Sequence, residues 1–207
     1  MNTKQKNWDA VAKKKLAGER VDYRHLPILE QLLRELGCDY NSRVADLGCY
    51  NAKDLVEFAR VFKSSAFFGY EISPTAVGVA KRLVAEYGLD KSVTILQQDI
   101  ESTLPVPDRY FNISIAKYIL PFIEDKISFI AEMKRISSHG VIVATPVVDD
   151  LWDANLSERG RSISMERDAF HNIMKRVFGD TFSIREILKD NSEDLIEIEV
   201  VIAKTGT

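Results

Sequence analysis

Apolar residues recur along this chain with two alternating periods, one typical of helices and one typical of buried strands. Short, mostly apolar runs predict five strands, at residues 43–47 (RVADL), 65–72, 92–100, 110–120 and 140–145. Apolar residues at every third or fourth position predict helices at 26–36, 51–62, 75–87 and 124–136. Strands that alternate with helices of this length need crossover connections, so the pattern predicts an α/β fold with a parallel sheet.

The pattern changes after the fifth predicted strand. A polar segment at 149–164 precedes a predicted helix at 165–178 and two strand-like runs at 181–188 and 194–204. The short polar connection KDNSED permits only an antiparallel pair. We therefore predict a doubly wound, mostly parallel, seven-stranded sheet with helices on both faces and a C-terminal antiparallel strand.

The N-terminal segment carries a basic run from Lys4 to Lys15. Its apolar residues have helical spacing and favour a helix that packs inward through Trp8, Val11, Ala12 and Leu16. The lysines then form a solvated face, or alternatively belong to a mobile lid or a patch that steers substrate. We expect residues 1–20 to be a helical extension or lid and residues 21–207 to form one Rossmann-like domain.

Composition narrows the class of protein. The 207 residues are 45% hydrophobic and 29% charged, and they contain no apolar run long enough for a membrane span. The net charge of −3 argues against binding to nucleic acid, which usually needs a basic excess. Cys38 and Cys49 lack metal-ligand spacing and are too few for a disulfide framework, and no secretory apolar segment is present. We expect a cytoplasmic protein without a metal.

Acidic residues close the first three predicted strands. In a doubly wound sheet, ligands bind beyond the carboxyl ends of the strands. Gly48 allows a tight turn after the first strand, where Asp46 accepts hydrogen bonds. Glu71 ends the second strand 25 residues after Asp46, at a position suited to both hydroxyls of a ribose. Acids at the ends of three successive strands indicate a ligand site more specifically than a single acid would.

Asp99 ends the third strand, where its carboxylate could accept from an adenine amino group. Ile72 and Ile100 would then supply apolar surfaces that contact the ring. The three strand ends together predict a nucleoside-containing cofactor.

Four segments of the chain resemble motifs of the class I S-adenosylmethionine-dependent methyltransferases. They are VADLGCYNA, FFGYEIS, LQQDI and YFNISIAKYILPFIED, and the resemblance spans residues 23–204. It implies that the methionine part of the cofactor lies along Asp46 and Gly48, and that Lys117 lies beside the methyl group or the substrate. The implied cofactor-binding residues are Asp46, Gly48, Tyr50, Glu71, Ile72, Asp99, Ile100 and Lys117.

The chain departs from the family pattern in the first motif. Tyr50 replaces a glycine, Ala52 stands where a small residue is frequent, and Asn112 stands where the family usually has an acid. A tyrosine at a position of close backbone approach blocks the methionine tail unless its ring points outward. A methyltransferase-like binding or scaffold protein with impaired cofactor binding is therefore an alternative hypothesis.

Methyl transfer from a sulfonium is an in-line displacement that needs mainly alignment, so the sequence identifies the cofactor better than the substrate. We expect O- or N-methylation of a small molecule, with specificity in residues 145–164 and the N-terminal helix. Asp149, Asp150 and Lys117 are the candidates for catalysis, although two adjacent aspartates in a loop are more typical of a solvated turn. An RNA methyltransferase that binds the RNA backbone through the Lys4–Lys15 run is a further alternative.

Overall fold

The computed structural model describes residues 2–16, 26–152, 157–189 and 197–205. The strands are β1 (Arg43–Leu47), β2 (Ala66–Glu71), β3 (Val93–Gln97), β4 (Phe111–Lys117), β5 (Ser137–Val148), β6 (Met165–Glu166), β7 (Phe182–Lys189) and β8 (Glu197–Lys204). The helices are α1 (Thr3–Leu16), α2 (Leu26–Glu35), α3 (Lys53–Val61), α4 (Pro74–Glu86), the 3-10 helix η1 (Leu120–Phe122), α5 (Lys126–Ile136), α6 (Glu158–Ile163) and α7 (Arg167–Phe178).

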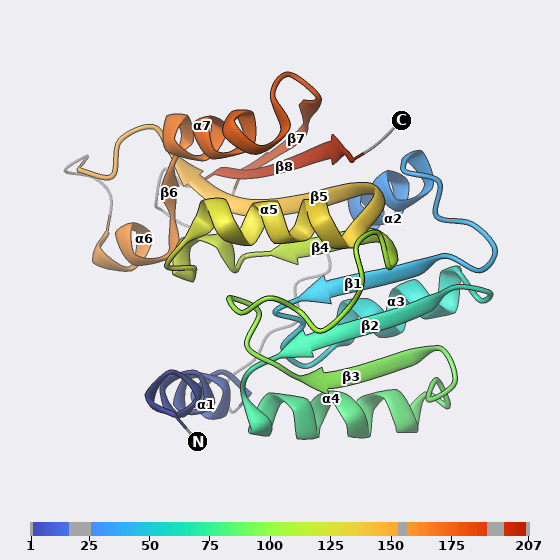
Figure 1. The fold of residues 1–207 in the computed structure, drawn as a ribbon. Helices are drawn as coiled ribbons and strands as arrows, with labels where there is room; N and C mark the ends of the chain where they lie inside the picture. The colour runs from blue at the N-terminus through green and yellow to red at the C-terminus, as the bar shows by residue number, and fades with distance from the viewer. Residues whose placement is uncertain (1, 17–25, 153–156, 190–196, 206–207) are drawn as a thin grey trace.

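The strands form one twisted sheet in the order β3-β2-β1-β4-β5-β8-β7 (Figure 1). Strands β1 to β5 are parallel, and β8 runs antiparallel between β5 and β7. The predicted doubly wound sheet with a C-terminal antiparallel strand is confirmed. The sequence did not predict α6 or the two-residue β6, which pairs with the end of β5 and brings the number of strands in the described residues to eight.

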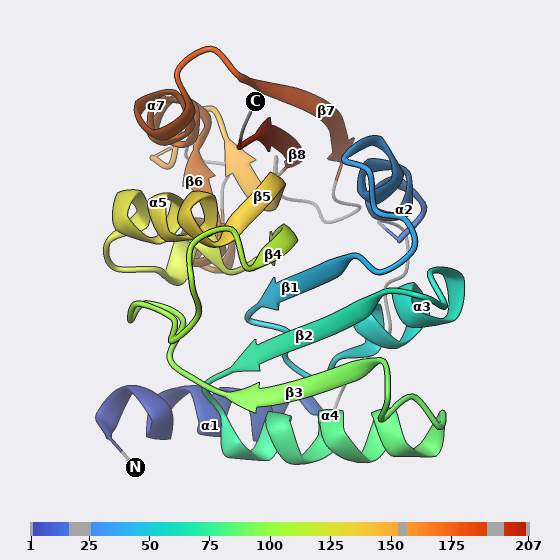
Figure 2. The same ribbon diagram turned by 45° about the vertical axis from the view of Figure 1, so that its right-hand side comes forward.

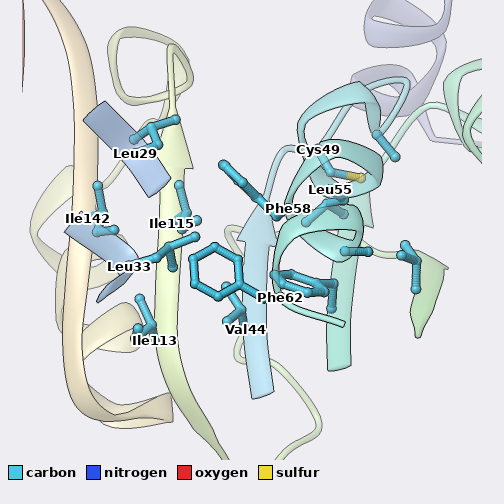
Figure 3. Close-up of a cluster of buried hydrophobic side chains, with 14 of the residues drawn as sticks. Leu29, Leu33, Val44, Cys49, Leu55, Phe58, Phe62, Ile113, Ile115 and Ile142 are labelled. Atoms are coloured by element: carbon cyan, nitrogen blue, oxygen red, sulfur yellow. The ribbon is translucent and has the colours of Figure 1, made fainter. Parts of the chain in front are cut away.

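Two hydrophobic layers cover the sheet. On one face, side chains from α2, α3 and α4 pack against β1, β2 and β4; Figure 3 shows Leu33, Phe58 and Phe62 around Val44. On the other face, α5 and α7 cover β4, β5 and β8. The connection from β3 to β4, residues 98–110, contains no helix, and the sequence pattern predicted none there. Strand order reverses between β1 and β4, which is where such sheets bind ligands.

Helix α4 begins directly beside the expected cofactor edge. The Ser73 hydroxyl accepts a hydrogen bond from the Ala76 N–H, and Pro74 occupies the first helical position. This combination is a strong N-terminal signal, because it satisfies one free N–H and omits another. It fixes the backbone immediately after Glu71.

Helix α1 lies next to α4, at the edge toward which β1, β2 and β3 point (Figure 2). Ala12 is buried as predicted, and the half-buried Trp8 makes an edge-to-face contact with Phe122 at 5.3 Å between ring centroids. The inward packing predicted for Val11 is wrong, since its side chain is 50% exposed. The reason is that the polar residue Asp9, and not Val11, faces α4. The side chain of Leu16 and the domain boundary predicted at residue 20 lie outside the residues described.

In the described part of the chain, no helix has the length and apolarity needed to cross a membrane.

Candidate functional site

The carboxyl ends of three adjacent strands place Asp46, Glu71 and Asp99 along one edge of the sheet. Strand β1 pairs with β2 through Leu47 opposite Tyr70, and β2 pairs with β3 through Glu71 opposite Gln97. Asp99 follows two residues after Gln97. The predicted neighbourhood of the three acids therefore follows from the register of parallel strands.

The turn after β1 keeps a glycine-like backbone despite its side chains. Gly48, Tyr50 and Ala52 have φ angles of 85°, 50° and 59°, in the left-handed region. A residue with a Cβ adopts this region at a cost of about 1–2 kcal/mol. The loop thus retains the conformation for which glycine is favoured, and the Tyr50 N–H points to the Glu71 carboxylate, 3.1 Å away. A Cβ added to Gly48 would lie 3.2 Å from the Ile119 side chain, so Ile119 would have to shift by a few tenths of an ångström to admit it.

The Glu71 side chain is buried and hydrogen-bonded to two backbone N–H groups. A carboxylate at an open strand end is usually solvated, but Glu71 is only 9% exposed. One carboxylate oxygen accepts from the Tyr50 N–H, and the other accepts from the Ser73 N–H at 2.7 Å. Glu71 therefore joins the turn after β1 to the start of α4.

Asp46 is a buried carboxyl group at the centre of the edge, with 6% of its surface exposed. Within the described ranges, no residue donates a hydrogen bond to its side chain. Burial, together with the nearby charges of Asp54 and Glu71, raises the pKa of Asp46 to about 7, and the charge of Lys117 opposes this shift. A cation entering this site would find a carboxyl group that ionises near neutral pH.

Lys117 lies at the end of β4, as the sequence indicated, but its ammonium forms an ion pair with Asp54 of α3. Both side chains are largely buried. The sequence analysis did not single out Asp54. An acidic residue in the first turn of a helix that follows a glycine turn was the available signal.

Asp99 is bound by a residue from the opposite end of the sequence. The Lys4 ammonium lies 2.9 and 3.1 Å from the two Asp99 carboxylate oxygens and 2.6 Å from Glu101. The Glu101 N–H also donates to Asp99, at 3.1 Å. No local pattern indicates a contact between residues 95 positions apart.

The remaining predicted residues fall into two groups. Ile72 and Ile100 are buried beside Glu71 and Asp99, where the sequence placed them. Asp149 is 85% exposed at its side chain and pairs with Arg167, and Asp150 accepts from the Trp152 N–H in a turn. Both aspartates therefore have a structural role in this segment. Their catalytic role stays a prediction.

Cys49 is packed behind the turn and not toward the strand ends. Its sulfur would lie 2.6 Å from a Cβ at Gly69, so the glycine in β2 makes room for it. Burial raises the pKa of the Cys49 thiol well above its usual value, which leaves it a poor nucleophile.

A second polar cluster lies between α7 and β8, and the sequence analysis missed it. The Glu199 carboxylate is fully buried, 2.7 Å from His171 Nε2, and Arg167 pairs with it and with Glu197. Because Arg167 also reaches Asp149, the cluster ties the segment after β5 to the sheet. Among the described residues, no group of three or more His, Cys, Asp and Glu is arranged to hold a metal ion.

Comparison with known proteins decides the family. A family model described as a methyltransferase domain matches residues 39–198. The chain belongs to the class I S-adenosylmethionine-dependent methyltransferases. Among curated proteins, this methyltransferase-family chain is similar to ajmaline N-methyltransferase of Rauvolfia serpentina, with 30% identity over 110 residues. That match covers 51% of the present chain and 36% of the relative, so the chain spans about a third of the relative's length.

Solved structures give the same fold. A methyltransferase dependent on S-adenosylmethionine from Aquifex aeolicus matches with a TM-score of 0.62 and 15% identity over 89% of this chain and 100% of that one. The (4+2)-cyclase SpnF matches with a TM-score of 0.70 and 16% identity over 86% and 80% of the two chains. At these identities the likeness concerns the fold alone.

Proposed function

We propose that this family member transfers a methyl group from S-adenosylmethionine to an oxygen or nitrogen of a small molecule. The observation that carries the proposal is the buried Asp46 carboxyl group, which receives no hydrogen bond from the described chain and is flanked by further strand-end acids. The cofactor has a sulfonium and an ammonium group, and buried carboxylates favour such cations. The residues present therefore fit the cofactor that the family implies.

Each strand end has a role in this proposal. Asp46 and Gly48 would bind the methionine part, Glu71 the ribose hydroxyls and Asp99 the adenine amino group. Ile72 and Ile100 would contact the adenine ring. When bound, the cofactor supplies an electrophilic methyl group.

The chain's own contribution to transfer is alignment and exclusion of water. Ile119 lies over Gly48, and the Lys117–Asp54 pair closes the edge beside Asp46. Lys117 would orient an acceptor oxygen or nitrogen as a hydrogen-bond donor. A hydroxyl acceptor would need a base, for which Asp149 and Asp150 remain the predicted candidates.

Two observations favour a small acceptor over RNA. The curated relative is named as an N-methyltransferase of ajmaline. In addition, Lys4 and Lys13 of the basic run are engaged in ion pairs with Asp99 and Asp9, which reduces the positive charge offered to phosphates. We retain a cytoplasmic location as part of the proposal.

The proposal is tested by measuring S-adenosylhomocysteine release with a panel of small hydroxyl and amine compounds and, separately, with total RNA. We expect turnover with a member of the small-molecule panel, and no salt-sensitive turnover with RNA. Turnover with RNA alone, lost when the lysines of α1 are replaced by glutamine, would establish the RNA alternative. The same fold occurs in SpnF, which is named as a cyclase, so cofactor binding alone does not establish methyl transfer. Binding of the cofactor without any release of S-adenosylhomocysteine would contradict the proposal.

Replacing Tyr50 by glycine distinguishes a chain that binds the cofactor from a scaffold protein whose cofactor site is plugged by the tyrosine ring. The turn already has the glycine-like backbone and the Tyr50 N–H is held by Glu71, so Tyr50→Gly should keep the conformation of the turn and act only through loss of the ring. A ring that lies outside the methionine position gives a change in cofactor affinity within about threefold, below about 1 kcal/mol. Calorimetric titration of both proteins measures this. A gain of a hundredfold or more would show that the ring plugs the site and would support a binding or scaffold role for the natural chain.

A further inference from the structure

Helix α1 contacts two of the three strand-end acids, directly or through one intermediate residue. Near its middle, Asp9 accepts hydrogen bonds from the Ser73 hydroxyl and the Thr75 N–H, each at 2.9 Å. In its first turn, Lys4 binds both oxygens of Asp99. Figure 2 shows α1 crossing beside the carboxyl ends of β2 and β3, next to the start of α4.

We propose that α1 sets cofactor affinity through two contacts of opposite sign, Asp9 acting as a positioning residue for Glu71 and Lys4 acting as a competitor for Asp99. This inference rests on the proposed function, since it assigns Glu71 to the ribose and Asp99 to the adenine amino group.

The Asp9 contact supports binding because it fixes Ser73 on both sides. The Ser73 N–H donates to Glu71, its hydroxyl donates to Asp9, and the same hydroxyl oxygen accepts from Ala76. Asp9 is itself buried and pairs with Lys13 at 2.8 Å. Lys13 and the Thr75 N–H hold the pKa of Asp9 well below its usual range, so Asp9 stays an acceptor at neutral pH. Loss of Asp9 would release Ser73 and hence the Glu71 carboxylate that it orients.

The Lys4 contact opposes binding because it occupies both acceptor oxygens that adenine needs. Lys4 and Asp99 are partly exposed, at 36% and 26% of their side-chain surfaces. Ion pairs of this exposure contribute only about 0–1 kcal/mol, so the pair is displaceable. Glu101, 2.6 Å from the Lys4 ammonium, offers an alternative partner when Asp99 turns to the adenine. When adenine binds, its amino group replaces the Lys4 ammonium as the donor to Asp99. Without Lys4, adenine has no competing donor to displace.

The test is a calorimetric titration of four full-length variants with S-adenosylhomocysteine at one salt concentration. Asp9→Ala should weaken binding by about three- to tenfold, the effect of losing a typical hydrogen bond, while Asp9→Asn should restore most of the affinity. Lys4→Met should strengthen binding by about two- to fivefold. Lys6→Met, at an exposed lysine of the same helix, is the matched control and should change nothing.

Opposite signs distinguish this proposal from a merely structural helix. If α1 only stabilised the fold, loosening it through Asp9 or through Lys4 would shift affinity in the same direction, and that result would overturn the proposal. Unchanged affinity in both variants would also overturn it. Melting temperatures confirm that each variant is folded, and Asp9→Ser, whose shorter side chain no longer reaches Ser73, replaces Asp9→Ala if the latter does not fold. Absence of binding by the natural chain would instead reject the proposed function.

Discussion

Replacing Asp46 by asparagine is expected to stabilise the free protein and to remove most of its affinity for S-adenosylmethionine. The Asp46 carboxyl group is buried and lies near Asp54 and Glu71, which makes its ionised form costly in the free protein. Asparagine has nearly the same shape and carries no charge. It therefore avoids the cost, but it also removes the attraction for the cationic cofactor.

The stabilisation should depend on pH with a definite sign. The folded-state pKa of about 7 lies above the ordinary value of 3.8, so the folded protein holds the proton more tightly than the unfolded chain. The free energy of unfolding therefore falls as pH rises from about 4 to 7, and the full cost of Asp46 is present above pH 7. A shift of about three pH units corresponds to at most about 4 kcal/mol. Asp46→Asn should thus stabilise the protein little at pH 4 and most at pH 8.

Urea denaturation of the natural chain and Asp46→Asn at pH 4, 6 and 8 measures this effect. Asp90→Asn is a suitable control because Asp90 is exposed in a turn. Equal stability changes at all three pH values would show that the pKa of Asp46 is not raised in the folded protein. Destabilisation at pH 8 would show that Asp46 is ionised and favourably bonded in the free protein. Retained cofactor affinity in Asp46→Asn would remove Asp46 from the binding site.

Replacing Glu71 by alanine is expected to damage both binding and stability. Loss of a charge-assisted pair of hydrogen bonds to the ribose should weaken S-adenosylmethionine binding by roughly 1.5–3 kcal/mol, about tenfold to a hundredfold. The same change leaves the N–H groups of Tyr50 and Ser73 without their acceptor, which should lower the free energy of unfolding by about 1–3 kcal/mol. Glu71→Gln retains one acceptor oxygen and should fall between alanine and the natural chain in both measurements.

Thermal unfolding and calorimetric titration of the two Glu71 variants test this prediction. Glu86→Ala, at an exposed position near the end of α4, serves as the control for loss of a glutamate. A lower melting temperature with unchanged affinity would mean that Glu71 only fixes the loop. That result would remove the ribose from the proposed binding mode.

Much of the architecture was predictable because it depends on local pattern. The strand RVADL is buried at every residue after Arg43, and the dipeptide Ser73-Pro74 is a strong start signal for α4. The positions of Asp46, Glu71 and Asp99 at one edge follow from the parallel register of their strands. The two-residue β6 was not predictable, because a strand this short has no periodicity of its own.

The electrostatic state of the site was not predictable from the sequence. Glu71 is buried because the turn carrying Tyr50 folds back onto it, and this depends on φ angles that the tyrosine itself disfavours. Lys4 reaches Asp99 only because α1 docks beside α4, a contact between distant segments. Local patterns therefore located the acids, whereas long-range packing determines which partners they have in the free protein.

The most direct test of this account is isothermal titration of the natural chain with S-adenosylmethionine and S-adenosylhomocysteine at pH 6 and pH 8. We predict one binding site per chain, with higher affinity for S-adenosylmethionine at pH 8, because Asp46 must ionise to hold the cation. No heat of binding and no shift in melting temperature with either compound at millimolar concentration would contradict the account.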